Sequence, residues 1–384
     1  MEENNSTNPQ DQQPQVPAQE QFIQQPQQDA GDNGLTSGEE ALTKAEPDTS
    51  TATPQVENPA SSLAFKNRLD LDKLSEAVSK IKTELRKVIV GQDEMIDLLI
   101  VSILANGHSL IEGVPGVAKT VTAKLLARTM DVGFSRIQCT PDLMPSDILG
   151  TSVFSMKNNE FEFKPGPVFS NIILIDEINR APAKTQAALF EAMAERQVTI
   201  DGKEYDLDAP FLVFATQNPI EQEGTYRLPE AQLDRFLFKI NVDYPNLEQE
   251  IQILQDNHER KDGNPELLVA PVLTAVDVKK YQGIVRNVII EDNLIKYIAQ
   301  IVMNTRNNAN LYLGASPRAS IAIMNGAKAY AAVMGRDFVT PDDIKYIAKA
   351  VMRHRIILTP EREMEGFTAD RVVMQLLETI EIPR

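Results

Sequence analysis

The hydrophobic pattern beyond about residue 70 predicts alternating strands and helices. Short apolar runs without polar alternation are typical of strands buried on both faces of a parallel sheet. Such runs lie at 109–112, 136–139, 172–176, 211–216 and 237–240. Helical spacing occupies 70–87 and much of the chain between the runs, including a strongly apolar helix that follows a short loop near Gly91. This alternation predicts an α/β domain in which helices cover a five-stranded parallel sheet.

Two segments alternate instead with a period of two, which is typical of strands exposed on one face. Residues 151–166 alternate about Asn158-Asn159, and residues 198–207 alternate about Asp201-Gly202, a pair favoured by two-residue type I′ turns. We predict that both are β-hairpins inserted into the α/β core. The pattern is compatible with hairpins that contact a partner or substrate. It is equally compatible with hairpins that have no role in binding.

After Tyr244-Pro245 the strand-like runs stop and helical spacing continues. Ser316-Pro317 and Thr340-Pro341 each combine a capping hydroxyl with a first-turn proline, so each predicts the start of a helix. Helices are predicted at 246–256, 274–287 and 291–306, and from residues 316 and 340. We therefore divide the folded part into an α/β core, 67–245, and an all-α domain, 246–384.

Composition separates the first 66 residues from the rest. Residues 1–60 contain 11 Asp or Glu against the single Lys44, and they contribute −10 to the chain's net charge of −17. They also hold 11 Gln, 7 Pro and one aromatic residue. Such a segment buries too little apolar surface to offset the entropy of ordering. We predict a disordered tail over 1–66, for which a solvated tether is favoured over a specific docking segment.

Several classes of protein are disfavoured by simple observations. The chain has no run of 18 apolar residues and no signal-peptide layout, so no membrane span is expected. Cys139 is the only cysteine, which excludes an intramolecular disulfide and suits a reducing compartment, the cytoplasm. The acidic balance also makes a nucleic-acid partner unexpected.

A candidate phosphate-binding loop, GVPGVAKT, follows the first strand-like run at residues 113–120. The motif G-x-x-x-x-G-K-[ST] converges backbone N–H groups on phosphates; here Lys119 would reach the β- and γ-phosphates and Thr120 would hold Mg²⁺. Ala118 replaces the second glycine. Even in a left-handed conformation its Cβ costs about 1–2 kcal/mol, which is small beside the contacts of a triphosphate and a metal ion. Alone, the motif could also be a chance glycine-rich turn.

Polar residues at the ends of later strands extend this candidate site. Asp176 and Glu177 end the run IILIDE, where Asp176 would support Mg²⁺ and Glu177 would polarise an attacking water. Asn218 ends the next strand at the same edge of the sheet and would position that water. An acidic turn after a buried strand is the alternative, but it is hard to reconcile with a phosphate loop upstream.

Two arginines are candidates for stabilising charge on the phosphates. Arg235 precedes the last strand-like run, and Arg227 is a weaker candidate nearby. Arg318 lies in the first turn of a predicted helix, where the helix dipole disfavours a cation. Its position suggests a phosphate partner, with a plain surface arginine as the alternative.

The order of these motifs resembles that of the AAA+ ATPases. Over about residues 68–384 the chain resembles the MoxR family in particular. The segments that carry this resemblance are GVPGVAKT, TPDLMPSDILGT, FKPGPVF, IDEINRAPAKTQAALFEAMAERQVT, ATQNPIEQEGTYRLPEAQLDRF and GASPRA. That family commonly has alanine before the loop lysine, so Ala118 departs from the general motif and not from the family.

The resemblance implies a role for each matching position. The Walker A loop would be Gly113, Val114, Pro115, Gly116, Val117, Ala118, Lys119 and Thr120. Asp176 and Glu177 would be Walker B, Asn218 sensor 1, Arg235 the arginine finger and Arg318 sensor 2. Residues 88–92, including Gln92, would pack around the adenine. The hairpin at 151–163 would be the helix-2 insert of this branch. A polar switch residue that contacts Glu177 is expected at either Gln138 or Thr140.

The resemblance also implies a function. It predicts a Mg²⁺-dependent ATPase that forms a homo-oligomeric ring, expected as a hexamer, with Arg318 in a lid placed over the nucleotide. Hydrolysis would change the angle between core and lid. The activity would be chaperone-like remodelling or activation of client proteins, including von Willebrand factor A domain partners. The alternatives are a chelatase-like ATPase subunit, a nucleic-acid-stimulated motor and a nucleotide-binding scaffold without hydrolysis.

Overall fold

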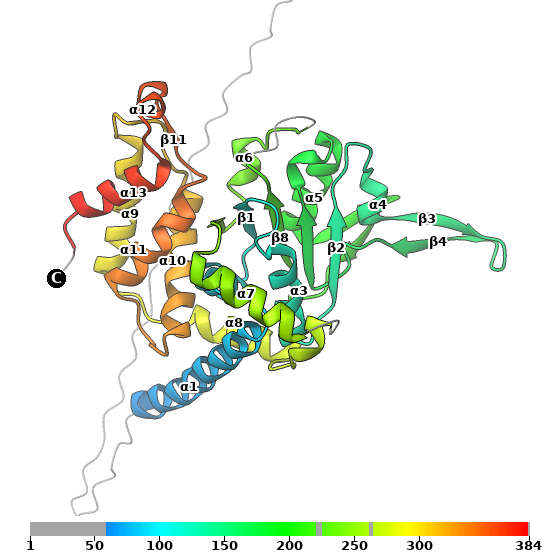
Figure 1. The fold of residues 1–384 in the computed structure, drawn as a ribbon, viewed down its shortest axis with the longest axis horizontal. Helices are drawn as coiled ribbons and strands as arrows, with labels where there is room; N and C mark the ends of the chain where they lie inside the picture. The colour runs from blue at the N-terminus through cyan, green and yellow to red at the C-terminus, as the bar shows by residue number, and fades with distance from the viewer. Residues whose placement is uncertain (1–58, 220–224, 261–263, 383–384) are drawn as a thin grey trace, which may run out of the picture. The chain divides into compact units, whose positions relative to one another are not determined.

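The computed structural model describes residues 59–219, 225–260 and 264–382 (Figure 1). Most of the expected tail, residues 1–58, lies outside the described residues. Helix α1 (Pro59–Arg86) begins at Pro59 and thus takes in residues 59–66, which the composition assigned to the tail. Within the described part of the chain, no helix is long and apolar enough to cross a membrane.

The five strand-like runs form one parallel sheet, which confirms the prediction. Its strands are β1 (Ser109–Gly113), β2 (Phe134–Gln138), β5 (Ile172–Asp176), β8 (Leu212–Gln217) and β9 (Phe238–Val242). They lie in the order β2-β5-β8-β1-β9, and each neighbouring pair is parallel. The carboxyl ends of all five strands therefore meet at one edge, the usual place for a ligand site in such sheets.

Both faces of the sheet are covered, which explains why the strands lack polar alternation. Ile172 and Leu174 belong to a buried cluster shared with α1, α2 (Asp93–Leu104) and α3 (Lys119–Thr129). Ile173 and Ile175 point to the opposite face and pack in a second cluster with α5 (Ala183–Glu195). Successive side chains of one strand thus enter two different cores.

Two antiparallel hairpins interrupt the α/β core, as the alternating segments predicted. The first is β3 (Gly150–Ser155) with β4 (Glu160–Pro165), which extends away from the sheet in Figure 1. The second is β6 (Gln197–Ile200) with β7 (Lys203–Asp206). The rings of Phe163 and Tyr205 lie 4.3 Å apart between centroids, and Ser152 Oγ donates to Asp201 Oδ2 at 2.5 Å. The hairpins are therefore joined to each other.

The C-terminal part is helical, as expected. Its helices are α7 (Leu247–Arg260), α8 (Ala275–Arg286), α9 (Asp292–Arg306), α10 (Pro317–Val333), α11 (Pro341–Met352), α12 (Pro360–Met364) and α13 (Ala369–Thr379). Ser316 caps α10 by accepting the Arg318 N–H, and Thr340 caps α11 in a capping box. A short antiparallel pair, β10 (Leu311–Leu313) with β11 (Ile357–Leu358), was not predicted, because strands this short show no period.

Short elements complete the described chain. They are α4 (Pro145–Leu149) before the first hairpin, α6 (Glu230–Leu233), and the 3₁₀ helices η1 (Ile178–Arg180) and η2 (Pro265–Leu268). The η2 helix lies in the segment between the helices predicted at 246–256 and 274–287. Part of that segment, residues 261–263, lies outside the described residues.

The helical part packs against the last strand of the sheet and the turn before it. A Cβ on Gly326 of α10 would lie 3.2 Å from the Phe238 ring, so glycine permits this close approach. After α11, the buried Arg355 donates through Nε to Asp234 Oδ1 at 2.8 Å and through Nη1 to the Leu237 carbonyl at 3.1 Å. His354 Nε2 lies 3.0 Å from the Phe236 carbonyl. These bonds fix the helical part to residues 234–237.

Candidate active site

The loop of residues 113–120 joins β1 to α3, the context that its motif requires. Ala118 has φ 60 and ψ 17, so the left-handed conformation that the sequence left open is adopted. Gly116 also has a positive φ, 88. Gly113 is required for another reason, because a Cβ there would lie 2.6 Å from the Val242 carbonyl oxygen of β9.

The side chains of the loop divide between core and surface. Val117 is buried, whereas Pro115 and Gly116 are exposed and Val114 is partly buried. Lys119 Nζ donates to the Gly113 carbonyl oxygen. Burial lowers the pKa of Lys119, while the negative charges of Asp176, Glu177 and Glu112 act in the opposite sense. The lysine is thus held against its own loop, within the electrostatic influence of three carboxylates.

A cleft of about 320 Å³ brings the loop together with the strand-end residues. It is lined by Pro115, Gly116, Ala118, Lys119, Thr120, Val121, Arg136, Gln138, Asp176, Glu177, Thr216 and Asn218. The structure therefore places Asp176, Glu177 and Asn218 beside the loop, as the parallel-sheet argument required. Arg227, Arg235 and Arg318 do not line this cleft.

Asp176 is the buried centre of the site. Thr120 Oγ1 lies 3.2 Å from Asp176 Oδ2. Thr216 Oγ1 donates to Asp176 Oδ1 at 2.9 Å and accepts the Glu177 N–H at 2.9 Å. A hydroxyl and a carboxylate this close suit Mg²⁺, which prefers oxygen ligands and usually takes one or two carboxylates with phosphate oxygens and water. In the described ranges no group of three or more His, Cys, Asp or Glu could hold a metal ion.

Glu177 is held by two side chains at the mouth of the cleft. Its backbone is left-handed, with φ 57, and the side-chain Oε2 accepts from Gln138 Nε2 at 3.0 Å and from Arg180 Nη1 at 3.2 Å. The sequence left the contact of Glu177 open between Gln138 and Thr140. The structure shows this contact for Gln138, whose side-chain amide donates to Glu177.

Sequence reasoning missed Arg136 and Thr216. Arg136 Nε donates to Asp176 Oδ2 at 2.7 Å, and its Nη2 donates to Gln138 Oε1 at 2.7 Å. The β2–β5 register pairs Gln138 with Asp176, and Arg136 lies two residues earlier on the same face of β2. The two-residue spacing of Arg136 and Gln138 was visible in the sequence. The strand register that places both side chains beside Asp176 and Glu177 was not.

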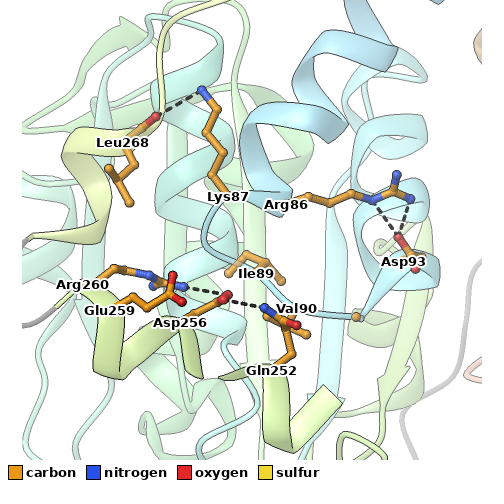
Figure 2. Close-up of a pocket in the computed structure, with 11 residues that line it drawn as sticks. Arg86, Lys87, Ile89, Val90, Asp93, Gln252, Asp256, Glu259, Arg260 and Leu268 are labelled. Atoms are coloured by element: carbon orange, nitrogen blue, oxygen red, sulfur yellow. Dashed lines mark hydrogen bonds and ion pairs between the residues drawn. The ribbon is translucent and has the colours of Figure 1, made fainter. Parts of the chain in front are cut away.

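The segment expected around adenine borders a separate cavity of about 600 Å³. Its lining includes Ile89 and Val90 and, from α7, Gln252, Asp256, Glu259 and Arg260, all of which Figure 2 labels. Arg86 pairs with Asp93 at 2.7 Å, and Arg260 pairs with Asp256 at 3.2 Å. Gln92 is not in the lining, because its Nε2 donates to the Asp243 carbonyl at 3.0 Å and ties the loop to the end of β9.

The three candidate arginines contact residues that do not line the cleft of the phosphate loop. Arg235 Nη1 donates to the Phe190 carbonyl at 3.1 Å. Arg318 Nη1 is 3.9 Å from Asp234 Oδ2, which also accepts from Ser316 Oγ at 2.9 Å. Arg227 is an exposed side chain 3.5 Å from Glu230. Arg318 does not line the cleft of the phosphate loop in this structure, and its expected role at the nucleotide stays a prediction.

Comparison with known proteins agrees with this site. The family "ATPase family associated with various cellular activities (AAA)" matches residues 108–238, and the AAA lid domain matches 303–376. A phosphate loop, two strand-end carboxylates and a strand-end asparagine on this parallel sheet, followed by a helical lid, define an AAA+ ATPase. Three similar proteins identify the family.

Protein YeaC of Bacillus subtilis is 44% identical over 310 residues, which span 81% of this chain and 96% of that protein. Chaperone MoxR1 of Mycobacterium tuberculosis is 43% identical over 78% of this chain and 81% of its own length. The crystal structure of a Cytophaga hutchinsonii protein assigned as an ATPase superposes with a TM-score of 0.78 at 42% identity, covering 85% of this chain and 100% of that one. The chain belongs to the MoxR family.

Proposed function

We propose that this AAA+ ATPase hydrolyses ATP with Mg²⁺ in the cleft between the phosphate loop and β5. The loop N–H groups and Lys119 bind the phosphates, and Thr120 with Asp176 holds the metal ion. Glu177 polarises the attacking water, which Asn218 positions. The single observation that carries the proposal is that all these side chains line one cleft. The cavity beside residues 89–91 would take the adenine.

The arginines suggest a site shared between subunits. Arg235 follows Asp234 in sequence, Arg318 Nη1 lies 3.9 Å from Asp234 Oδ2, and neither arginine lines the cleft of its own chain. An arginine supplied from a neighbour stabilises transition-state charge and contributes about 10³–10⁵ in rate. We therefore propose a homo-oligomeric ring, a hexamer, in which both arginines reach the cleft of the next subunit.

The first hairpin is the proposed client contact. Met156, Phe161 and Phe154 are 92%, 74% and 46% exposed, and the two phenylalanine rings lie 5.4 Å apart between centroids. Exposed apolar side chains grouped on a projecting hairpin suit a protein partner. The relative named as a chaperone supports chaperone-like remodelling of client proteins. The family resemblance alone suggests von Willebrand factor A domain proteins among these clients. The single buried cysteine, Cys139, supports a cytoplasmic location.

The enzyme proposal is tested with Glu177→Gln, which keeps the shape of the side chain and removes its basicity. Turnover should fall by about 10²–10⁴ while binding of a fluorescent ATP analogue persists. Glu191→Gln, an exposed change on α5, is the matched control and should leave both unchanged. If Glu177→Gln leaves turnover intact, Glu177 is not the base and the proposed mechanism is wrong. A wild-type protein that binds the analogue but shows no turnover would be a nucleotide-binding scaffold.

A further inference from the structure

Arg136 occupies a chemically important position in the cleft. Its Nε lies 2.7 Å from Asp176 Oδ2, and its side chain is 51% exposed whereas that of Asp176 is 9% exposed. A partly solvated guanidinium thus covers the outer edge of a nearly buried carboxylate. Removing the cation would leave a poorly solvated negative charge, so Arg136 stabilises the carboxylate in this structure.

The same carboxylate oxygen is part of the proposed metal site. Thr120 Oγ1 lies 3.2 Å from Asp176 Oδ2, the atom that accepts from Arg136. A divalent cation held by Thr120 and Asp176 would therefore lie a few ångströms from the guanidinium. Two cations this close repel one another, and the repulsion is stronger in a half-buried cleft than in water. Arg136 and a metal ion thus compete for one carboxylate.

Arg136 is also connected to the proposed base. Its second nitrogen donates to Gln138 Oε1 at 2.7 Å, and Gln138 Nε2 donates to Glu177 Oε2 at 3.0 Å. An amide that accepts at one end and donates at the other has its orientation fixed by both partners. If the guanidinium leaves Asp176, the orientation of Gln138 toward Glu177 loses one of its two supports.

We propose that Arg136 is an internal counter-ion of Asp176 that has to leave before that carboxylate can take a metal ion, and that its departure loosens the hold of Gln138 on Glu177. Arg136 is then a positioning residue that couples metal binding to the release of the base. This inference rests on the proposed function, because it takes the Thr120–Asp176 pair as the metal site.

The competition between Arg136 and the metal ion is tested by titrating Mg²⁺ and following the binding of a fluorescent ADP analogue, which requires no turnover. The quantity compared is the Mg²⁺ concentration at half-maximal binding, called the Mg²⁺ midpoint. Arg136→Gln removes the competing charge, so the midpoint should fall roughly tenfold, the size expected for one charge-assisted hydrogen bond. Arg136→Lys keeps a positive charge and should stay near the wild-type midpoint. Arg362→Gln removes an arginine paired with Glu365 in the lid and should change nothing.

The outcomes separate this inference from the proposed function. If the wild-type protein binds no nucleotide, the proposed function fails first. If it binds and Arg136→Gln leaves the Mg²⁺ midpoint unchanged, the counter-ion role is wrong. If Arg136→Gln instead weakens binding of ATP analogues more than of ADP, Arg136 is a phosphate ligand and the inference is overturned.

The link to Glu177 needs a second measurement. Turnover at saturating Mg²⁺ is compared for Arg136→Gln, Gln138→Ala and the double variant. Because the two side chains act through one hydrogen-bonded path, their effects should be non-additive. Additive effects would show that Arg136 influences Asp176 alone and would remove the second half of the proposal.

Discussion

His108 shows how one side chain can be locked in one protonation state. It is buried, its Nδ1 accepts the Val213 N–H at 3.0 Å, and Nε2 lies 3.1 Å from the Met193 carbonyl. The proton must therefore be on Nε2, and the ring is neutral. Burial lowers the pKa of His108 from 6.5 to about 4. Protonation of Nδ1 would break the bond to the sheet.

This histidine predicts a loss of stability in weak acid. Between pH 6.5 and about 4 the unfolded chain binds a proton at His108 that the folded chain does not, so stability falls as pH falls. The expected slope from this group is about 1.4 kcal/mol per pH unit in that window. Urea unfolding at pH 7, 6 and 5 measures it. The His108→Gln variant should be less stable at pH 7, but its unfolding free energy should fall less steeply with pH, by up to the contribution of one proton. Equal pH dependence in the variant and the wild type would contradict the conclusion that His108 is neutral in the folded protein.

Single residues of the site were predictable where a motif fixes their spacing. Lys119 begins the helix after β1, Asp176 ends β5 and Glu177 follows it, each at a position that its motif fixes, and the cleft brings them together. Arg136 and Thr216 were not found, because their contacts with Asp176 depend on the register of strands far apart in sequence. Cross-strand partners of this kind carry no local sequence signal.

The elements were predicted best where they are long or fully buried. The five apolar runs and both hairpins follow directly from their hydrophobic periods. The β10–β11 pair escaped detection because its strands are only three and two residues long. The contact between Phe163 of one hairpin and Tyr205 of the other was also beyond the pattern, since it depends on tertiary packing.

Gly150 at the base of the first hairpin is expected to be intolerant of a side chain. It has φ 101, and a Cβ would lie 2.3 Å from the Lys164 carbonyl oxygen and 2.7 Å from the Gly166 nitrogen. Gly150→Ala combines backbone strain with a clash against backbone that cannot move aside, so it should destabilise the protein by about 2–4 kcal/mol in urea unfolding.

Gly202 in the turn of the second hairpin is a matched control for this prediction. It also has a positive φ, 74, but a Cβ there would meet nothing within 4 Å. Gly202→Ala should therefore cost only the conformational strain, about 1–2 kcal/mol. Equal losses for the two variants would show that the crowding at Gly150 is relieved and that strain alone matters.

At the scale of the whole molecule, the attachment of the lid was the least predictable feature. The caps of α10 and α11 were readable, but the side of the sheet on which these helices pack was not. The buried Arg355, which bonds Asp234 and the Leu237 carbonyl, joins the lid to the segment that carries Arg235. An isolated arginine in the sequence does not reveal such partners.

The shared-site model predicts complementation between two inactive variants. Arg235→Ala should lower turnover by about 10³ or more while the monomer's affinity for ATP changes little, because the arginine serves a neighbour. Mixing Arg235→Ala with Glu177→Gln should restore activity, because some sites then combine an intact cleft with an intact arginine. ATPase assays across mixing ratios measure this, and a flat response would contradict the model.

Neither Arg235 nor Arg318 lines the cleft of its own chain, and this has a geometric consequence. If each subunit offers its arginines at one surface and its cleft at another, neighbours must join head to tail. A two-fold symmetric pair would bring like surfaces together and complete no site, whereas a closed cycle completes every one. The arginines of each subunit would then contact the nucleotide of only one of its two neighbours. The effect of nucleotide would therefore pass from subunit to subunit in one sense around the ring.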